Sequence, residues 1–314
     1  MRVLVTGASG FVGRHLLAAL AEAGHAAIAA GGPADGAPFV PLDLRDAAGV
    51  ARVVADAHPD HIVHLAGQAF VPRSIADPLE TFAVNAGGTA NVLEAARRFR
   101  DATGTAVRTL IVSSAEVYGI QRPERMPLDE SALLRPHNPY AASKAAAELY
   151  ARSYAQTYDL FVAIARPFNH IGPGQDARFA VASFAQQIAQ IAAGGPKIMQ
   201  VGNLEAQRDF LDVRDVVRAY LALLANAGSG EVYNICSGRA VALREVLRQL
   251  ITIARVAVEI RDDPERMRPS DVPLLLGEAA KLRSATGWEP AYALPASLRD
   301  IYADAQARAA AASA

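Results

Sequence analysis

Short apolar segments alternate with longer segments rich in alanine and leucine over the first 165 residues. Short β-branched or aliphatic runs predict strands, and longer runs with helical periodicity predict helices. The expected strands are 2–6, 26–30, 61–65, 108–113 and 160–166, and the expected helices are 12–23, 47–57, 83–98 and 140–158. This alternation predicts an α/β fold with a doubly wound parallel sheet that helices cover on both faces.

Beyond residue 166 the alternation loosens, and Gly- and Pro-rich segments intervene. We expect the larger domain to comprise residues 1–166 and about 209–237. A smaller C-terminal lobe, from about 167–208 and 238–302, is expected to pack on the edge of the sheet. The Ala-rich residues 303–314 form either a helix extension or a frayed tail.

Composition excludes several classes of protein. With 314 residues, 52% of them hydrophobic, and a net charge of −1, the chain can bury a large core but presents no broad positive field, so no nucleic-acid partner is expected. No stretch reaches 18 uninterrupted apolar residues, and glycines interrupt the N-terminal segment that a signal peptide needs, so we expect no membrane span and a cytoplasmic location. Cys236 is the single cysteine, which excludes an internal disulfide, and its apolar neighbours predict a buried, unreactive thiol.

Two further patterns are not expected to form sites. His58, His61 and His64 run into a strand, where alternation prevents them from converging on one ion, so no metal site is expected. Asp212 and Asp215 flank Arg214 at the start of a helix, where such charges typically form a solvated cap.

Three glycines follow the first strand, in the segment Thr6-Gly7-Ala8-Ser9-Gly10-Phe11-Val12-Gly13. Glycine permits a tight turn at the first position, close approach of a pyrophosphate at the second, and close helix–strand packing at the third. The amides that begin the next helix then face the phosphates. Because the strand and the helix are both present, the motif predicts a Rossmann-type dinucleotide site.

The choice between NAD(H) and NADP(H) depends on the end of the second strand. A carboxylate there holds the ribose 2′-hydroxyl of NAD. This chain has Ala29-Ala30-Gly31-Gly32-Pro33, with Asp35 too far into the loop and no arginine to clamp a 2′-phosphate. Both cofactors stay open, with a preference for NADP(H).

Tyr140 and Lys144 are spaced i,i+4, so they share one helix face. A neighbouring ammonium stabilises a phenolate, so we expect Lys144 to lower the Tyr140 pKa from its ordinary value of about 10. Ser114 follows the strand 108–113, at the sheet edge where ligands gather. The three residues suit hydride transfer at a carbon that bears oxygen: Ser114 polarises the carbonyl and Tyr140 delivers the proton.

The order of these motifs resembles the extended short-chain dehydrogenases/reductases of the nucleotide-sugar epimerase/dehydratase superfamily, over about residues 1–302. The segments that carry the resemblance are the glycine turn, Asp43-Leu44, His64-Leu65-Ala66, Asn85-Ala-Gly-Gly-Thr-Ala-Asn, Ser113-Ser114-Ala-Glu-Val-Tyr-Gly119 and Tyr140-x-x-x-Lys144. The resemblance implies a cofactor site made of Gly7, Gly10, Phe11, Val12, Gly13, Asp43, Leu44, Leu65, Ala66, Gly67, Asn85, Tyr140, Lys144 and Pro167. Gly67 departs from the family, which usually has alanine there.

Segments 166–175 and 201–210 are similar to those of GDP-6-deoxy-D-mannose reductases, a group within this family. This similarity implies a GDP-sugar substrate, namely GDP-4-dehydro-6-deoxy-D-mannose reduced at its 4-keto group to GDP-D-rhamnose. It implies that Asn169, Asn203, Arg208 and Arg268 contact the substrate. Arginine suits the diphosphate because its planar fork donates two parallel hydrogen bonds.

Alternatives to the reductase remain. Glu116 stands two residues after Ser114, where 4,6-dehydratases carry a catalytic carboxylate, so a GDP-mannose 4,6-dehydratase or another nucleotide-sugar epimerase/dehydratase is the second hypothesis. A non-catalytic dinucleotide-binding sensor is the third, disfavoured because Ser114, Tyr140 and Lys144 are all present. The family resemblance also implies a homodimer, packed through the Ala-rich helices 83–98 and 140–158.

Overall fold

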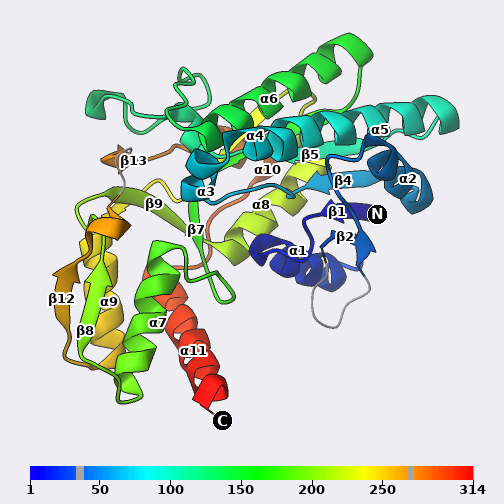
Figure 1. The fold of residues 1–314 in the computed structure, drawn as a ribbon. Helices are drawn as coiled ribbons and strands as arrows, with labels where there is room; N and C mark the ends of the chain where they lie inside the picture. The colour runs from blue at the N-terminus through cyan, green and yellow to red at the C-terminus, as the bar shows by residue number, and fades with distance from the viewer. Residues whose placement is uncertain (33–38, 268–271, 314) are drawn as a thin grey trace.

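The computed structural model describes residues 1–32, 39–267 and 272–313, and a seven-stranded parallel sheet lies at its centre (Figure 1). The strand order is β10-β6-β5-β4-β1-β2-β3. The strands are β1 (Arg2–Thr6), β2 (Ala26–Gly31), β3 (Val40–Pro41), β4 (His61–His64), β5 (Arg108–Val112), β6 (Val162–Pro167) and β10 (Val232–Ile235). Every neighbouring pair in this sheet is parallel, which confirms the predicted doubly wound α/β fold.

Helices cover both faces of the sheet (Figure 1). One face carries α1 (Phe11–Glu22), α8 (Val213–Asn226) and α10 (Ala280–Thr286), and the other carries α2 (Ala47–Ala57), α5 (Gly88–Thr103) and α6 (Pro139–Tyr158). Val3 and Val5 are buried in the first of these two cores, while Leu4 is buried in the second. Successive strand residues therefore serve opposite faces, which is why these strands are almost continuously apolar.

The helix expected at 83–98 is longer and interrupted. Helices α3 (Val71–Ala76) and α4 (Pro78–Phe82) come first, Ala83–Gly87 then forms a single π-helical turn, and α5 runs on to Thr103. Asp77 caps α4 by accepting a hydrogen bond from the Glu80 backbone nitrogen. Periodicity alone does not reveal the wider turn, because it changes the helix by a single residue.

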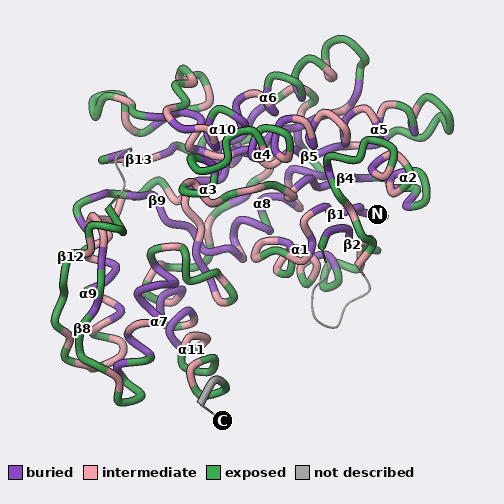
Figure 2. The backbone as a smooth tube through the Cα atoms, viewed as in Figure 1, coloured by how far each residue is buried: buried purple, intermediate pink, exposed green. Residues whose placement is uncertain are grey.

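The second part of the chain forms two smaller sheets. Strand β9 (Gln207–Asp212) pairs with β7 (Asn169–Ile171), β11 (Ala240–Ala242) and β13 (Leu274–Leu275), and β8 (Ile198–Val201) pairs with β12 (Glu259–Asp262). A third core joins α7 (Ala180–Ala192), α9 (Leu243–Ala254) and α11 (Leu294–Ser313). Figure 2 shows the contrast between this part and the main sheet: β12 is exposed along its length, whereas β4 is buried throughout.

The predicted division into two lobes stays a prediction, supported by the place of β10 in the large sheet and of β8, β11 and β12 in the small ones. At the C-terminus the chain takes the helical alternative, since α11 continues to Ser313. Among the described residues, none of the helices combines the length and apolar character that a membrane crossing requires.

Candidate active site

The β1–α1 turn has no room for side chains at two of its glycines. Gly7 has φ +72°, and a Cβ atom there would lie 2.7 Å from the Ala66 backbone nitrogen. A Cβ atom on Gly13 would lie 2.4 Å from the Gly7 carbonyl oxygen. The turn is thus pressed against the segment Leu65–Ala66 that follows β4, and Phe11 and Val12 begin α1 beside it. This cradle, bounded by the amides that start a helix, fits a dinucleotide pyrophosphate.

The residues predicted near the adenine lie at the β2–β3 side of the sheet. Arg45 donates two side-chain hydrogen bonds to Asp43, and these bonds lower the pKa of that carboxyl to about 2. Leu44 is buried in the core under α2 and α5, and a Cβ atom on Gly88 would lie 2.7 Å from it. Asp35 lies outside the described residues.

The side chain of Arg14 lies near the end of β2, a proximity that the sequence spacing did not reveal. Arg14 Nε donates to the Ser9 carbonyl oxygen at 3.0 Å. The Ser9 hydroxyl in turn lies 3.4 Å from where a Cβ atom on Gly31 would be. Arg14 belongs to α1, so its proximity to the second strand follows from the packing of the turn rather than from its position in the chain.

Ser114 and Tyr140 come together at the C-terminal end of β5, as predicted. Asn138 caps α6 by accepting a 2.8 Å hydrogen bond from the Ala141 nitrogen, which starts the helix where Tyr140 reaches the sheet. The Ser114 side chain lies close enough to the Tyr140 phenol to lower its pKa. The Lys144 Nζ donates to the Val112 carbonyl oxygen at 2.9 Å, so the lysine is also tied to the end of β5.

The expected effect of Lys144 on the Tyr140 pKa is wrong for this structure. Burial raises the pKa of Tyr140 to about 12, which the Ser114 hydrogen bond partly offsets, and the charge of Glu116 raises it further. Lys144 is not among the groups that shift it. Burial also lowers the pKa of Lys144 to about 8, against an opposing contribution from Glu148. For the Lys144 pKa, removal from water thus outweighs the charge of Glu148.

Gly67 accommodates the side chain of Asn85. The Asn85 amide accepts from the Gln68 nitrogen at 2.8 Å and donates to the Ser143 hydroxyl at 2.9 Å. A Cβ atom on Gly67 would lie 2.8 Å from Asn85 Oδ1 and 3.4 Å from Lys144 Nζ. An alanine at position 67, as the family usually has, would therefore clash with the side chain of Asn85, which projects from the π-helical turn.

A buried polar cluster beneath these residues was missed by the sequence analysis. Glu148 and Arg166 form an ion pair at 2.6 Å with side chains only 1% and 2% exposed. Ser113 donates to Glu148 at 2.5 Å, and Arg166 Nη1 donates to the Tyr118 hydroxyl at 2.9 Å. The available signal was the spacing of Glu148 one turn after Lys144 on the same helix face.

The predicted substrate residues follow β6, which ends at Pro167. Asn169 in β7 is paired with Phe210 of β9, two residues after Arg208 on that strand. Arg208 is 9% exposed, and its Nη1 donates to the carbonyl oxygens of Gln207 and Val272. Asn203 lies before β9 and accepts a hydrogen bond from the Glu205 nitrogen. Arg268 lies outside the described residues.

Two other predictions, for Cys236 and for the Asp212–Asp215 segment, have different outcomes. Cys236 is buried, which confirms its predicted burial, and burial raises the pKa of its thiol. Asp212 does cap α8 through the Arg214 nitrogen, but it and Asp215 are buried rather than solvated. Asp215 accepts from the backbone nitrogens of Ala291 and Tyr292, a long-range partner that local spacing cannot show.

Comparison with known proteins places this geometry in a family. A family model described as GDP-mannose 4,6 dehydratase matches residues 4–301. The chain is 42% identical to the GDP-6-deoxy-D-mannose reductase of Pseudomonas aeruginosa, with 98% of each protein covered. Its structure matches that of RMD from Pseudomonas aeruginosa complexed with NADPH with a TM-score of 0.87 and 39% identity, covering 98% of this chain and 100% of the other.

A second solved structure is nearly as similar. The UDP-glucose 4-epimerase of Thermus thermophilus in complex with NAD gives a TM-score of 0.86 and 33% identity, over 98% of this chain and 99% of that one. A UDP-glucose 4-epimerase thus shares this fold. The chain belongs to the GDP-mannose 4,6-dehydratase family of extended short-chain dehydrogenases/reductases.

Proposed function

We propose that this protein reduces the 4-keto group of GDP-4-dehydro-6-deoxy-D-mannose to GDP-D-rhamnose with a nicotinamide dinucleotide. The observation that carries the proposal is that Ser114 and Tyr140 are neighbours at the end of β5, with Lys144 tied to the same strand end. It occurs in a chain 42% identical to a GDP-6-deoxy-D-mannose reductase over nearly its full length.

The dinucleotide supplies hydride to the carbonyl carbon when it is bound. Gly7, Gly10 and the first residues of α1 would hold its pyrophosphate, Asp43 and Leu44 its adenine, and the segment 65–67 with Asn85 and Pro167 the remainder. Tyr140 donates its phenolic proton to the carbonyl oxygen, and Ser114 donates a hydrogen bond to the same oxygen. Lys144, one turn along α6, holds this helix and with it Tyr140 against the end of β5 through the Val112 carbonyl oxygen.

We infer a preference for NADPH. Ala29, Ala30 and Gly31 at the end of β2 provide no carboxylate to repel a 2′-phosphate. Arg14 is attached to the Ser9 loop beside that strand end and offers a cation. The related RMD structure contains NADPH.

We infer that Arg208 and Asn169 bind the GDP portion of the substrate, with Asn203 and Arg268. Support comes from β9, which presents Arg208 two residues before the partner of Asn169. Because Arg208 Nη1 donates to the Val272 carbonyl oxygen, contact with a diphosphate requires the guanidinium to use its other N–H groups or to exchange this bond. Arg208→Ala is expected to raise KM more than it lowers kcat.

A coupled assay tests the proposal. GDP-mannose and a known 4,6-dehydratase generate the keto sugar, and the absorbance of NADPH or NADH is followed after this protein is added. Oxidation of the cofactor with formation of a reduced GDP-sugar supports the reductase. We expect the protein to oxidise NADPH faster than NADH. Conversion of GDP-mannose by this protein alone would instead assign a dehydratase with Glu116 as its base.

Tyr140→Phe tests the role of the phenol. Loss of the acid is expected to lower kcat by about 10²–10⁴-fold while dinucleotide binding is retained. Tyr150→Phe on the same helix is the matched control, because Tyr150 is 51% exposed and lies outside the site. Equal activity of Tyr140→Phe and Tyr150→Phe would contradict the assignment.

We also propose a homodimer, with the enzyme located in the cytoplasm. Leu79 and Phe82 on α4, and Leu149 and Tyr150 on α6, are large apolar side chains more than half exposed on two helices that pack together. Such a patch is typical of a protein–protein interface. Light scattering is expected to give twice the chain mass, and Leu149→Glu is expected to yield the monomer.

A further inference from the structure

A continuous set of buried hydrogen bonds runs beneath the acid–base residues from β5 to β10. Ser113 Oγ donates to Glu148 Oε1 at 2.5 Å, and Arg166 donates to both carboxylate oxygens of Glu148. Arg166 Nη1 donates to Tyr118 Oη, which donates to Asn234 Oδ1 at 2.7 Å. The cluster therefore links the end of β5, the strands β6 and β10, the helix α6 and the 3-10 turn Ala115–Tyr118 that follows Ser114.

The cluster meets the proposed catalytic residues at two points. Ser113 and Ser114 are adjacent in an extended chain, so one hydroxyl faces Glu148 while the other faces Tyr140. Glu148 is also one turn along α6 from Lys144, whose ammonium is bonded to the residue before Ser113. Displacement of Glu148 would thus disturb both the strand end and the lysine.

We propose that the buried Glu148–Arg166 pair is a positioning device for the acid–base group: it keeps the Lys144 ammonium charged and holds the end of β5 against α6. This inference rests on the proposed reductase function. Glu148 and Arg166 touch neither substrate nor dinucleotide in this scheme, and they act through Ser113 and Lys144.

The charges around Lys144 give the proposal a direction. The titratable groups whose charges interact with that of Lys144 are Glu148 on its own helix and His64 on β4, and Tyr140 lies one turn earlier on α6. His64 is buried in neutral form, because burial and the Lys144 charge lower its pKa to about 3. The Glu148 carboxylate is thus the anion that opposes the loss of charge from Lys144, and Arg166 is the cation that partly neutralises this carboxylate.

Direct titration of the lysine tests this without any reaction. The chain has three lysines, so protein labelled with ¹³C at lysine Cε gives three signals, and Lys144→Arg identifies that of Lys144. Lys197 is exposed and lies outside the site, so its signal is the internal reference. The wild-type Lys144 signal is expected to titrate near 8.

Removal of each partner is expected to move this midpoint in opposite directions. Glu148→Gln leaves the Arg166 cation without its anion, and the Lys144 midpoint falls by about 1 pH unit. Arg166→Met leaves the Glu148 anion unscreened, and the midpoint rises. The double variant is expected between the two. Equal midpoints, or shifts in the same direction, in the two folded single variants would overturn the proposal.

Two further variants guard against a purely structural explanation. Asp215→Asn removes another fully buried carboxylate, on α8, and is expected to lower the unfolding temperature without moving the Lys144 midpoint. If Glu148→Gln does not fold, the double variant carries the test, since it leaves no unpaired buried charge. Its midpoint is expected below that of the wild type, and an unchanged midpoint would contradict the inference.

The kinetic arm separates this inference from the proposed function. The basic limb of kcat/KM in the reductase assay is expected to shift with the Lys144 midpoint in each variant. A wild-type protein that shows no reductase activity refutes the proposed function, while the lysine titration still decides what Glu148 and Arg166 do. An active wild type whose variants keep the wild-type midpoint refutes only the positioning role.

Discussion

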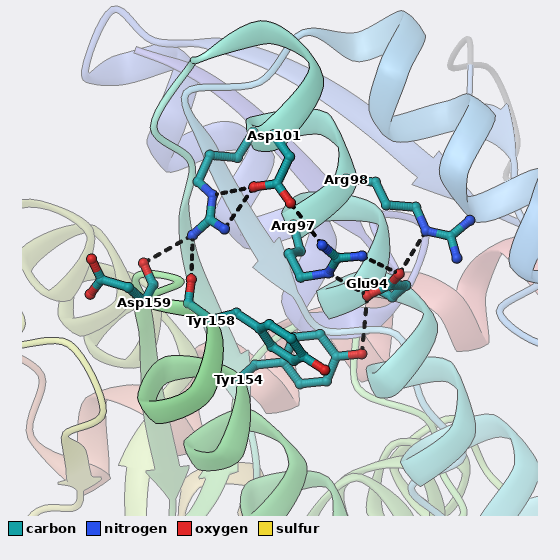
Figure 3. A network of polar contacts seen from close by, with 8 residues as sticks. Glu94, Arg97, Arg98, Asp101, Tyr154, Tyr158 and Asp159 are labelled. Carbon is teal, nitrogen blue, oxygen red and sulfur yellow. Dashed lines mark hydrogen bonds and ion pairs between the residues drawn. The ribbon is translucent and has the colours of Figure 1, made fainter.

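Helix α6 takes part in two ionic networks with nearly identical bond lengths and different surroundings. Toward its middle, Glu148 meets Arg166 at 2.6 Å with both side chains almost fully buried. At its C-terminal end, Tyr154 and Tyr158 join Glu94, Arg97, Arg98 and Asp101 of α5 at the surface (Figure 3). There Arg98 meets Glu94 at the same 2.6 Å, but the Arg98 side chain is 69% exposed.

Equal distances therefore conceal unequal energetics. In water the interaction of two such charges is about 1 kcal/mol at 4 Å, and salt screens it. In a buried site both the attraction and the cost of an unpaired charge are several-fold larger. The environment of a pair, rather than its separation, decides whether it stabilises the fold or controls the chemistry beside it.

The largest effect is expected from breaking the buried pair. Glu148→Ala leaves the Arg166 guanidinium buried without its anion, so the free energy of unfolding is expected to fall by about 3–5 kcal/mol. Urea denaturation followed by circular dichroism measures it. A loss below about 1 kcal/mol, the value typical of an exposed pair, would show that the two networks do not differ as the comparison requires.

Acid titration of His64 is expected to have the next largest effect. Its ring shares hydrogen bonds with Thr6 and Thr89, and burial lowers its pKa to about 3, against an ordinary 6.5. Between these values the unfolded chain binds more protons than the folded one, so stability falls as the pH falls, by about 1.4 kcal/mol per pH unit. The free energy of unfolding is measured between about pH 6 and 4, and its slope against pH is compared with that of His64→Gln, which lacks the titrating ring. Identical slopes in the two proteins would contradict the prediction.

Gly67→Ala disturbs a buried polar group without changing any charge. Because the new Cβ would lie 2.8 Å from Asn85 Oδ1, the amide must shift and weaken its bonds to Gln68 and Ser143. We expect a loss of about 1–2 kcal/mol of stability and weaker dinucleotide binding by calorimetry. Gly87→Ala is the matched control, since its Cβ would have no neighbour closer than 4.0 Å and helical alanine is favoured over glycine. A Gly67→Ala protein as stable as Gly87→Ala would show that Asn85 is free to move.

The smallest effect is expected at the surface network. Arg98→Ala removes an exposed arm of the Glu94 cluster, and the expected loss is about 0.5 kcal/mol or less at low salt. In about 1 M NaCl this loss is expected to vanish, because the screening length falls to about 3 Å. A salt-independent loss of about 3–5 kcal/mol, the size expected for Glu148→Ala, would also contradict the comparison, because the exposed pair would then behave like the buried one.

Local sequence was sufficient for much of the fold and for the outline of the site. Alternating apolar and amphipathic segments specified the parallel sheet, because strand burial and helix periodicity are local patterns. The glycine turn and the Tyr140–Lys144 spacing marked the sheet edge where Ser114 and Tyr140 meet. The π-helical turn at 83–87 was missed, because a single turn widened by one residue leaves no distinct pattern in the hydrophobicity of the sequence.

What only the tertiary structure decided concerns partners far apart in the chain and their removal from water. Glu148 finds Arg166 on the next strand and Ser113 35 residues earlier, and Asp215 finds backbone nitrogens 76 residues later. The pKa of Tyr140 rises rather than falls, since burial outweighs the opposing contribution of Ser114. Residue identity and spacing determine which groups can react; the folded environment sets their charge, because desolvation depends on every segment packed around them.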